Sequence, residues 1–299
     1  MNTPSPFRRR TSVSAVVPFC IAACFASLWS GAASTSSAQT PASPATVRPS
    51  HPQAHAHNDY LHERPLLDAL DNGFRSIEAD VFLVEGDLWV AHSVSELSAD
   101  RTLKALYLDP LRQRMQSNVK AEGSSDSFQS VESDGLPVTL LIDLKSEGES
   151  TYRALNQLLS TYDDVFTHVD SKGVHRRGVT AIISGNRPIE LVQSDLPRFV
   201  GVDGRLDDLE GDHSADLMPL ISDHWGRHFK WRGKGELPEA DRQKLSLILE
   251  RAHQQNRRVR FWATPDHEAA WKVLHDAGVD LINTDDLEGL HRFLQSQSK

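Results

Sequence analysis

Short β-rich runs alternate with amphipathic stretches along most of this chain, and this alternation constrains the fold more than any other feature. Eight runs predict strands, and most are followed by apolar residues at helical spacing. The predicted strands lie near residues 55, 78, 140, 181, 200, 220, 261 and 281. Eight such units over about 245 residues are typical of a (β/α)8 TIM barrel, so we expect an α/β fold of this class.

A doubly wound open sheet is the alternative fold for such an alternation. That fold usually carries a glycine-rich phosphate loop after its first strand, but residues 57–60 read His-Asn-Asp-Tyr. The barrel is therefore favoured. It also predicts where function lies, because catalytic residues of such barrels collect at the C-terminal ends of the strands.

The N-terminal segment predicts export. Residues 8–10 are arginines, residues 13–28 are mostly apolar, and residues 36–38 are small, as in a secretory signal peptide. An uncleaved anchor is the alternative, but Pro18 interrupts an apolar run that is short for a spanning helix of about 20 residues. We expect a signal peptide over residues 1–38, no stable membrane span in the mature protein, and a secreted or periplasmic location.

Both cysteines, Cys20 and Cys24, lie inside this segment. Residues 21–24 read Ile-Ala-Ala-Cys and loosely resemble a lipoprotein cleavage box, but the apolar run continues past Cys24, so lipid anchoring there ranks second. The mature domain then has no cysteines for an internal disulfide. Residues 39–52 are rich in Ala, Pro, Ser and Thr and predict a flexible linker, which leaves residues 53–299 for the barrel.

The charge balance argues against nucleic acid as a partner. The formal net charge is -9, and no basic patch follows the N-terminal arginines. A phosphate-bearing small molecule or lipid remains possible as a substrate, because a bound cation can offset acidic ligands locally. No feature of the sequence implies a protein partner.

Three carboxylates predict a metal site. Glu78 and Asp80 are one residue apart on a predicted strand, so both side chains point to the same face. Neighbouring carboxylates inside a barrel repel one another unless a cation or a proton lies between them. Asp143, at the end of the next barrel strand, adds a third oxygen ligand. Such a set suits one divalent cation, Mg²⁺ or Ca²⁺, better than zinc. Helix capping or pairing with an arginine is the alternative role.

Other polar residues at strand ends predict acid–base chemistry and substrate contacts. His57 and His92 could exchange protons near neutral pH, because the ordinary pKa of histidine is about 6.5. Lys145 could bind a phosphate oxygen, or instead form a salt bridge with Asp80 or Asp143. Arg187 is a further candidate for binding substrate. Three tryptophans near the barrel mouth either stack on a head group or pack in the core: Trp225, Trp231 and Trp262.

Five sequence blocks resemble the altered inheritance of mitochondria protein 6 family. This family lies in the superfamily of glycerophosphodiester phosphodiesterases, phosphatidylinositol-specific phospholipases C and sphingomyelinase D-like enzymes. The blocks are residues 57–60, 76–81, 106–111, 141–145 and 260–265. The resemblance implies that His57 and His92 are catalytic. It implies further that Glu78, Asp80 and Asp143 bind the metal. Asn58 matches a position where eukaryotic phospholipases C have a calcium-binding asparagine.

Two departures from the superfamily pattern bear on the substrate. Asn58-Asp59 replaces the Arg-Gly that follows the first histidine of glycerophosphodiester phosphodiesterases, and Asp143 replaces their third-strand glutamate. Both argue against a glycerophosphodiester. The resemblance still implies a phosphoric diester hydrolase acting on a small-molecule or lipid phosphodiester, of the phospholipid head-group or glycerophosphodiester type. Attack by an internal hydroxyl would release a cyclic phosphate, which is phosphorus–oxygen lyase chemistry.

Two other functions stay open at this point. His55 and His57 form a His-x-His pair like those that begin the metal sites of amidohydrolase and polymerase-histidinol-phosphatase-type barrels, with His224 and Asp285 as further ligands. Zinc or iron in the purified protein would favour that function. A secreted binding barrel without turnover is the second possibility, and an assay with generic phosphodiesters would test it.

Overall fold

The computed structural model describes residues 50–122 and 130–298. The predicted signal peptide and most of the predicted linker lie outside the described residues. Two residues assigned to that linker, His51 and Pro52, belong instead to the first strand. The barrel domain therefore begins slightly earlier than the composition of the sequence indicates.

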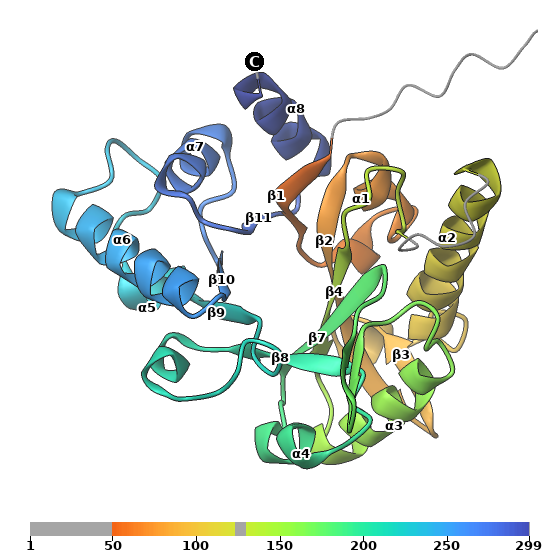
Figure 1. Cartoon of the computed structure of the whole chain (residues 1–299). Coiled ribbons are helices and arrows are strands. Elements are labelled where there is room, and N and C mark those ends of the chain that lie inside the picture. Colours follow the sequence, from red (N-terminus) through yellow and green to blue (C-terminus); the bar gives the residue numbers. More distant parts are fainter. Residues whose placement is uncertain (1–49, 123–129, 299) are drawn as a thin grey trace, which may run out of the picture. The chain divides into compact units, whose positions relative to one another are not determined.

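Eight parallel strands follow one another in chain order around the sheet (Figure 1). They are β1 (His51–Ala56), β2 (Phe74–Val84), β4 (Val138–Leu144), β7 (Val179–Gly185), β8 (Val200–Gly204), β9 (Leu220–His224), β10 (Arg258–Trp262) and β11 (Ile282–Thr284). β1 pairs with both β2 and β11. Between β10 and β11 the described residues form an isolated parallel bridge, Arg260 with Leu281, which closes the ring. The predicted (β/α)8 barrel is confirmed.

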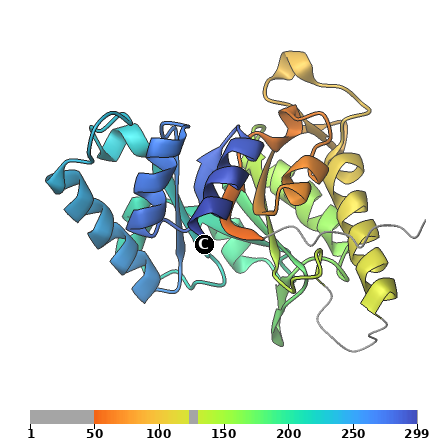
Figure 2. The same cartoon turned by 90° about the horizontal axis from the view of Figure 1, so that it is seen from above.

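Helices connect the strands. They are α1 (Leu67–Asp71), α2 (Asp109–Glu122), α3 (Gly148–Ser160), α4 (Ile189–Ser194), α5 (Trp225–His228), α6 (Glu239–Gln254), α7 (Glu268–Ala277) and α8 (Leu287–Gln297). The yellow helix α2 and the light-blue helix α6 lie on opposite sides of the strands (Figure 2). Three 3-10 turns, η1 (Asp59–Leu61), η2 (Val94–Glu96) and η4 (Leu206–Glu210), and a π-helical turn, η3 (Lys104–Leu108), lie in the connections.

Two hairpins depart from the simple β/α rhythm. β3 (Asp87–Val90) returns antiparallel to β2 through a turn in which Glu85 and Gly86 have φ angles of 51° and 95°. β5 (His168–Asp170) pairs with β6 (Gly173–His175) between α3 and β7, and this hairpin was not expected. Each of its strands has three residues, too few for a period-two pattern to stand out.

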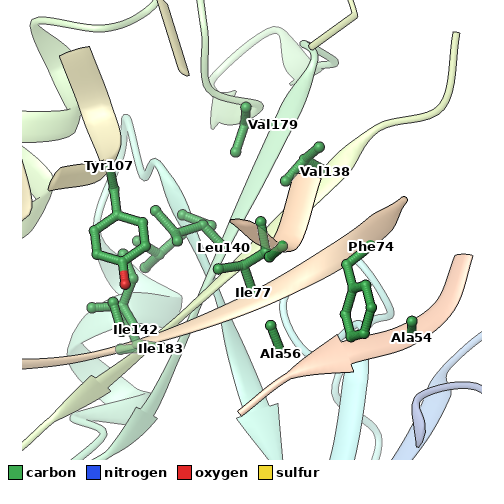
Figure 3. Packing of buried hydrophobic residues seen from close by; sticks show 14 of the residues in the cluster. Ala54, Ala56, Phe74, Ile77, Tyr107, Val138, Leu140, Ile142, Val179 and Ile183 are labelled. Atoms are coloured by element: carbon green, nitrogen blue, oxygen red, sulfur yellow. The ribbon is translucent and has the colours of Figure 1, made fainter. Parts of the chain in front are cut away.

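Strand register separates the core into two parts. Leu140 and Ile142 of β4 belong to a large cluster that also holds helix residues such as Leu155, and part of it is drawn in Figure 3. Leu141 of β4, Ile182 of β7, Leu220 of β9 and Leu281, which directly precedes β11, form a separate buried cluster. Side chains alternate along a strand, so Leu141 and Asp143 face one way and Leu140 and Ile142 the other.

The register also aligns the polar residues. Glu78 pairs with Leu141, and Leu141 pairs with Ile182, while Asp80 pairs with Asp143 two residues further on. Because Leu141 and Ile182 form the small cluster inside the ring, Glu78 and Asp80 point into the barrel above it. Apolar residues thus fill the barrel interior, and carboxylates follow toward the C-terminal ends of the strands.

Candidate metal and acid–base site

Three carboxylates meet where β2 and β4 end. Among the described residues, Glu78, Asp80 and Asp143 form the group that could hold a metal ion, with one ligand atom from each within 4.8 Å of the others. Asp80 and Asp143 are direct neighbours in the parallel register. The predicted meeting of these three side chains is therefore confirmed as a matter of geometry.

The carboxylate oxygens fit a hard cation. Within the described part of the chain, Oδ1 of Asp80 and Oδ1 of Asp143 are buried and have no hydrogen-bond partner. Buried acceptors without a partner are costly, and carboxylate oxygens are the ligands that Mg²⁺ and Ca²⁺ prefer. Gly185, with φ of 68°, makes room for this arrangement, since a Cβ there would lie 1.9 Å from Oδ1 of Asp143.

Lys145 supplies one positive charge to this group. Its Nζ lies 2.7 Å from Oδ2 of Asp143 and 3.1 Å from Oδ2 of Asp80, so the salt-bridge alternative is realised with both partners. Burial raises the pKa of Asp80 to about 6, although the charge of Lys145 acts in the opposite direction. Asp80 and Asp143 thus share the single positive charge of Lys145, and the third carboxylate, Glu78, needs a partner of its own.

Glu78 is paired elsewhere. Its Oε2 accepts from Nη1 of Arg260, at 2.8 Å, and lies 2.9 Å from Nε2 of His55. Burial alone would raise the pKa of Glu78, but the charge of Arg260 and the hydrogen bond from His55 outweigh it and hold that pKa well below its usual range. The two cations, Lys145 and Arg260, together leave the three carboxylates with one excess negative charge.

His55 supports Glu78 from inside the barrel. Its Nδ1 lies 2.7 Å from Oγ of Ser76, and its Nε2 also lies 2.7 Å from Nη1 of Arg260. Burial, together with the charge of Arg260, lowers the pKa of His55 to about 4, so the ring is neutral at pH 7. Both ring nitrogens have protein partners, which gives no support to a His-x-His metal site.

His57 is oriented by an acidic residue from the last barrel strand's loop. Its Nδ1 lies 2.8 Å from Oδ1 of Asp285, which follows β11. A carboxylate only accepts hydrogen bonds, so Nδ1 carries the proton of this bond. Burial would lower the pKa of His57, but the bond to Asp285 and the charge of Glu78 outweigh it and raise that pKa above its ordinary value.

Tyr60 connects the other predicted residues, and sequence reasoning did not single it out. Its hydroxyl lies 2.7 Å from Oδ2 of Asp80, 2.8 Å from Oδ1 of Asn58 and 3.1 Å from Nδ1 of His92. The residue is 2 % exposed. Asn58 adopts the left-handed conformation, with φ of 47°, and its Nδ2 lies 3.2 Å from Nδ1 of His57. Because Nδ1 of His57 carries the proton that it donates to Asp285, it cannot accept from this amide nitrogen. The contacts through Tyr60 therefore join Asn58, Asp80 and His92, but not His57.

His92 is the most open member of this group. It follows β3, its side chain is 58 % exposed, and its Nδ1 lies 3.5 Å from Oδ2 of Asp80. The sequence signal for Tyr60 was its position in the block 57–60. The contacts of its hydroxyl depend on the left-handed backbone conformation of Asn58, which the sequence alone did not predict.

Arg187 and Trp262 lie at the same end of the barrel but on later strands. Arg187 follows β7 and donates from Nη1 to the carbonyl oxygen of Asp203. Trp262 ends β10, and the guanidinium of Arg205 lies 4.9 Å from the centroid of its ring. Arg205, not singled out from the sequence, therefore connects the two predicted substrate contacts. Trp225 and Trp231, which are 1 % and 5 % exposed, pack in the core instead.

A TIM barrel with three carboxylates and two histidines at the C-terminal ends of its early strands has the layout of a phosphodiesterase-like domain. Comparison with known families agrees. A model described as the AIM6-like phosphodiesterase domain matches residues 45–203, and one of the glycerophosphoryl diester phosphodiesterase family matches residues 258–288. The chain belongs to the altered inheritance of mitochondria protein 6 family, within the glycerophosphodiester phosphodiesterase superfamily.

Two fungal proteins illustrate the relationship. Altered inheritance of mitochondria protein 6 of Eremothecium gossypii is 30% identical over 275 residues, which cover 81% of this chain and 69% of the relative. The homolog of Arthroderma benhamiae is 30% identical over 258 residues, covering 78% of this chain and 81% of the relative.

Solved structures of glycerophosphodiester phosphodiesterases were matched as well. The protein from Parabacteroides distasonis is 15% identical with a TM-score of 0.47, and the match covers 83% of this chain and 98% of that one. The protein from Agrobacterium tumefaciens is 16% identical with a TM-score of 0.45, and the match covers 82% of this chain and 95% of that one.

No helix among residues 50–122 and 130–298 has the length and apolar character needed to cross a bilayer.

Proposed function

We propose that this protein is a secreted, metal-dependent phosphodiesterase that acts on a small-molecule or lipid phosphodiester. Glu78, Asp80 and Asp143 would hold one Mg²⁺ or Ca²⁺, with the amide of Asn58 beside them as a further candidate ligand. The observation that carries the proposal is the pair of buried, unpartnered oxygens on Asp80 and Asp143, with His92 joined to Asp80 through Tyr60 and His57 held by Asp285.

The two histidines would move the protons. Asp285 fixes the proton of His57 on Nδ1, which leaves Nε2 to accept a proton from the attacking hydroxyl or water. His92, held through Tyr60 and open to solvent, would protonate the leaving oxygen. Lys145 would place positive charge near the phosphate. A divalent cation, when bound, would offset the charge that develops on the non-bridging oxygens.

The attacking group decides the product. An internal hydroxyl next to the phosphate would give a cyclic phosphate, and water would give a phosphomonoester directly. Phosphorus NMR distinguishes these products in one experiment. The purified mature protein would be incubated with a panel of phosphodiesters and lysophospholipids, with EDTA and after Mg²⁺ or Ca²⁺ is added back. We expect turnover only with metal, and full activity in EDTA would contradict the proposal.

The same samples test the other two functions. Metal analysis that finds zinc or iron, with activity that depends on His55 rather than His92, would replace the phosphodiesterase by an amidohydrolase-type enzyme. Binding of a head group without turnover would indicate a silent binding barrel. Export is a separate proposal that rests on residues 1–38, and N-terminal sequencing of the protein recovered outside the cytoplasm would test it.

A further inference from the structure

Two guanidinium groups converge at the ends of β7 and β8. Arg187 and Arg205 both donate from Nη1 to the carbonyl oxygen of Asp203, and the second of these contacts is 3.1 Å long. Two donors that share one acceptor lie within a few ångströms of each other. Like charges at such a distance repel, so this arrangement requires a compensating anion.

The protein supplies only part of that compensation. The carboxylate of Asp203 is fully buried and lies 3.0 Å from Nη1 of Arg205. It also accepts from Ser184, at 2.8 Å, and from Ser222, at 2.5 Å. In the described part of the chain, no carboxylate lies within ion-pair distance of Arg187, and its buried Nε has no acceptor. Arg187 therefore lacks an ion pair, and the carboxylates of Asp208 and Asp143 act on it only from a greater distance.

Trp262 holds the guanidinium of Arg205 in place at the barrel mouth. The guanidinium of Arg205 lies over the indole ring, at 4.9 Å from the ring centroid, as in a cation–π contact. A guanidinium that stacks by its face keeps its N–H edge available for hydrogen bonds. Nη1 of Arg205 is already used by Asp203 and Gly204. Nη2 has two N–H groups, and its contact with Oγ of Ser184 is long, at 3.4 Å. The side chain is 24 % exposed, so Nη2 is the donor offered to a solute.

This arginine pair lies beside the metal group. Ser184, which donates to Asp203, is the register partner of Asp143 on the neighbouring strand. Adjacent strands are about 4.8 Å apart, so the ends of β7 and β8 lie roughly 5 to 10 Å from the end of β4. That span suits a head group of the size of a sugar, with a scissile phosphate at one end and a second charged group at the other.

We propose that Arg187 and Arg205, backed by Trp262, bind a second anionic group on the substrate, a phosphomonoester or a carboxylate. The inference rests on the proposed function and adds to it the class of substrate. The preferred phosphodiester then has an anionic head group, and head groups such as choline, which are cationic, are disfavoured by the unpaired charge of Arg187.

Binding can be measured without turnover. Isothermal titration calorimetry of the EDTA-treated full-length mature protein would use inositol 4-phosphate, glucuronate and inositol as probes. We expect the phosphomonoester to bind and inositol to fail. Glucuronate binding as well would mean that any anion suffices, and its failure would narrow the ligand to a phosphomonoester. Inositol binding as tightly as the anions would overturn the proposal.

Variants assign the binding to the two arginines. Arg187→Gln and Arg205→Gln should each weaken inositol 4-phosphate on the order of 10- to 100-fold, the usual worth of charge-assisted hydrogen bonds. Arg205→Lys, which keeps the charge but loses the fork, replaces the glutamine variant if that one fails to fold. Arg176→Gln, an arginine with a 72 % exposed side chain, is the matched control and should bind as wild type. Unchanged binding by the Arg187 and Arg205 variants would contradict the assignment.

A turnover experiment then connects this group to catalysis. The ratio of kcat/KM for lysophosphatidylinositol 4-phosphate to that for lysophosphatidylcholine should be well above one, and it should fall at least 10-fold in Arg205→Gln. Absence of all turnover would contradict the proposed phosphodiesterase activity, while the calorimetry would still decide the anion site. A ratio near one in an active enzyme would contradict the anion site alone.

Discussion

The two halves of the barrel mouth carry opposite charge. Glu78, Asp80 and Asp143, on β2 and β4, form an acidic half that has unpartnered oxygens, and Arg187 and Arg205, after β7 and β8, form a basic half that has an unpaired cation. Each half is only partly neutralised by its own side chains. The two proposed sites depend on this difference: the acidic half would take a cation and the basic half an anion, as a metal-bound phosphodiester with a charged head group would provide.

The largest expected effect comes from Asp143→Asn, which should abolish metal binding by the acidic half without changing anion binding by the basic half. Asp143→Asn removes a carboxylate of the acidic half and leaves Lys145 with one partner. We expect activity to fall roughly 10³-fold or more, because metal stabilisation of the transition state is worth several kcal/mol. Calorimetry should show loss of Mg²⁺ or Ca²⁺ binding but unchanged binding of inositol 4-phosphate. Loss of both would mean that the halves are not independent.

The histidines test whether the acidic half also holds the acid and the base. His57→Ala and His92→Ala should each lower kcat by about 10² to 10⁴, the usual worth of a positioned acid or base. The double variant should lose much less than the product of both, since the groups act in one step. His267→Ala, at an exposed histidine, serves as the control. A double variant with fully multiplicative losses would argue against a shared step.

Tyr60 tests how the acidic half is held in place. Tyr60→Phe keeps the buried ring but removes the hydroxyl that meets Asp80, Asn58 and His92. We expect metal affinity or kcat to fall about 10- to 100-fold, as for other residues that orient metal ligands. The basic half should not respond, so the Kd of inositol 4-phosphate is the internal control. Wild-type activity in this variant would make the hydroxyl a packing feature only.

His55 tests the interior support of Glu78. Replacing an exposed histidine by alanine changes the free energy of unfolding little, but the ring of His55 is buried between Ser76, Glu78 and Arg260. We therefore expect a loss of about 1–3 kcal/mol in the free energy of unfolding, measured with urea, because buried partners lose their hydrogen bonds. His55→Gln should recover part of the lost free energy of unfolding.

Replacing Glu78 itself would leave Arg260 as an unpaired buried charge, so Asp143 is the better position for a variant that removes metal binding alone.

The smallest expected effect is a shift in pH dependence. If His57 is the base, activity falls as the pH drops through its pKa, which lies above the ordinary 6.5 because of Asp285 and Glu78. Asp285→Asn removes the carboxylate, so burial becomes the dominant influence and the pKa falls. The acid limb of the kcat/KM profile should then move to lower pH. If the alkaline limb moves to lower pH while the acid limb stays in place, His57 acts as the acid instead.

Sequence reasoning reached the acidic half more fully than the basic half. Glu78 and Asp80 are readable because the period of two along a strand fixes their common direction, and the barrel rhythm brings Asp143 beside them. Arg205 could not be predicted, because its role depends on neighbours on two other strands, Ser184 of β7 and Trp262 of β10. The same holds for Tyr60, which depends on the backbone reversal at Asn58. Local pattern predicts which face a side chain takes, but not which distant group it meets.

The weak pairing between β10 and β11 links the proposed metal ligands to local opening of the barrel. An isolated bridge joins these strands in the described chain, supported by a hydrogen bond of 3.1 Å from the amide of Leu281 to the carbonyl of Val259. Arg260, which forms that bridge, also holds Glu78. Opening of the seam should therefore be coupled to metal binding. Amide hydrogen exchange around residues 259–261 and 281–284 should slow when Mg²⁺ or Ca²⁺ binds, while exchange in β7 stays the same.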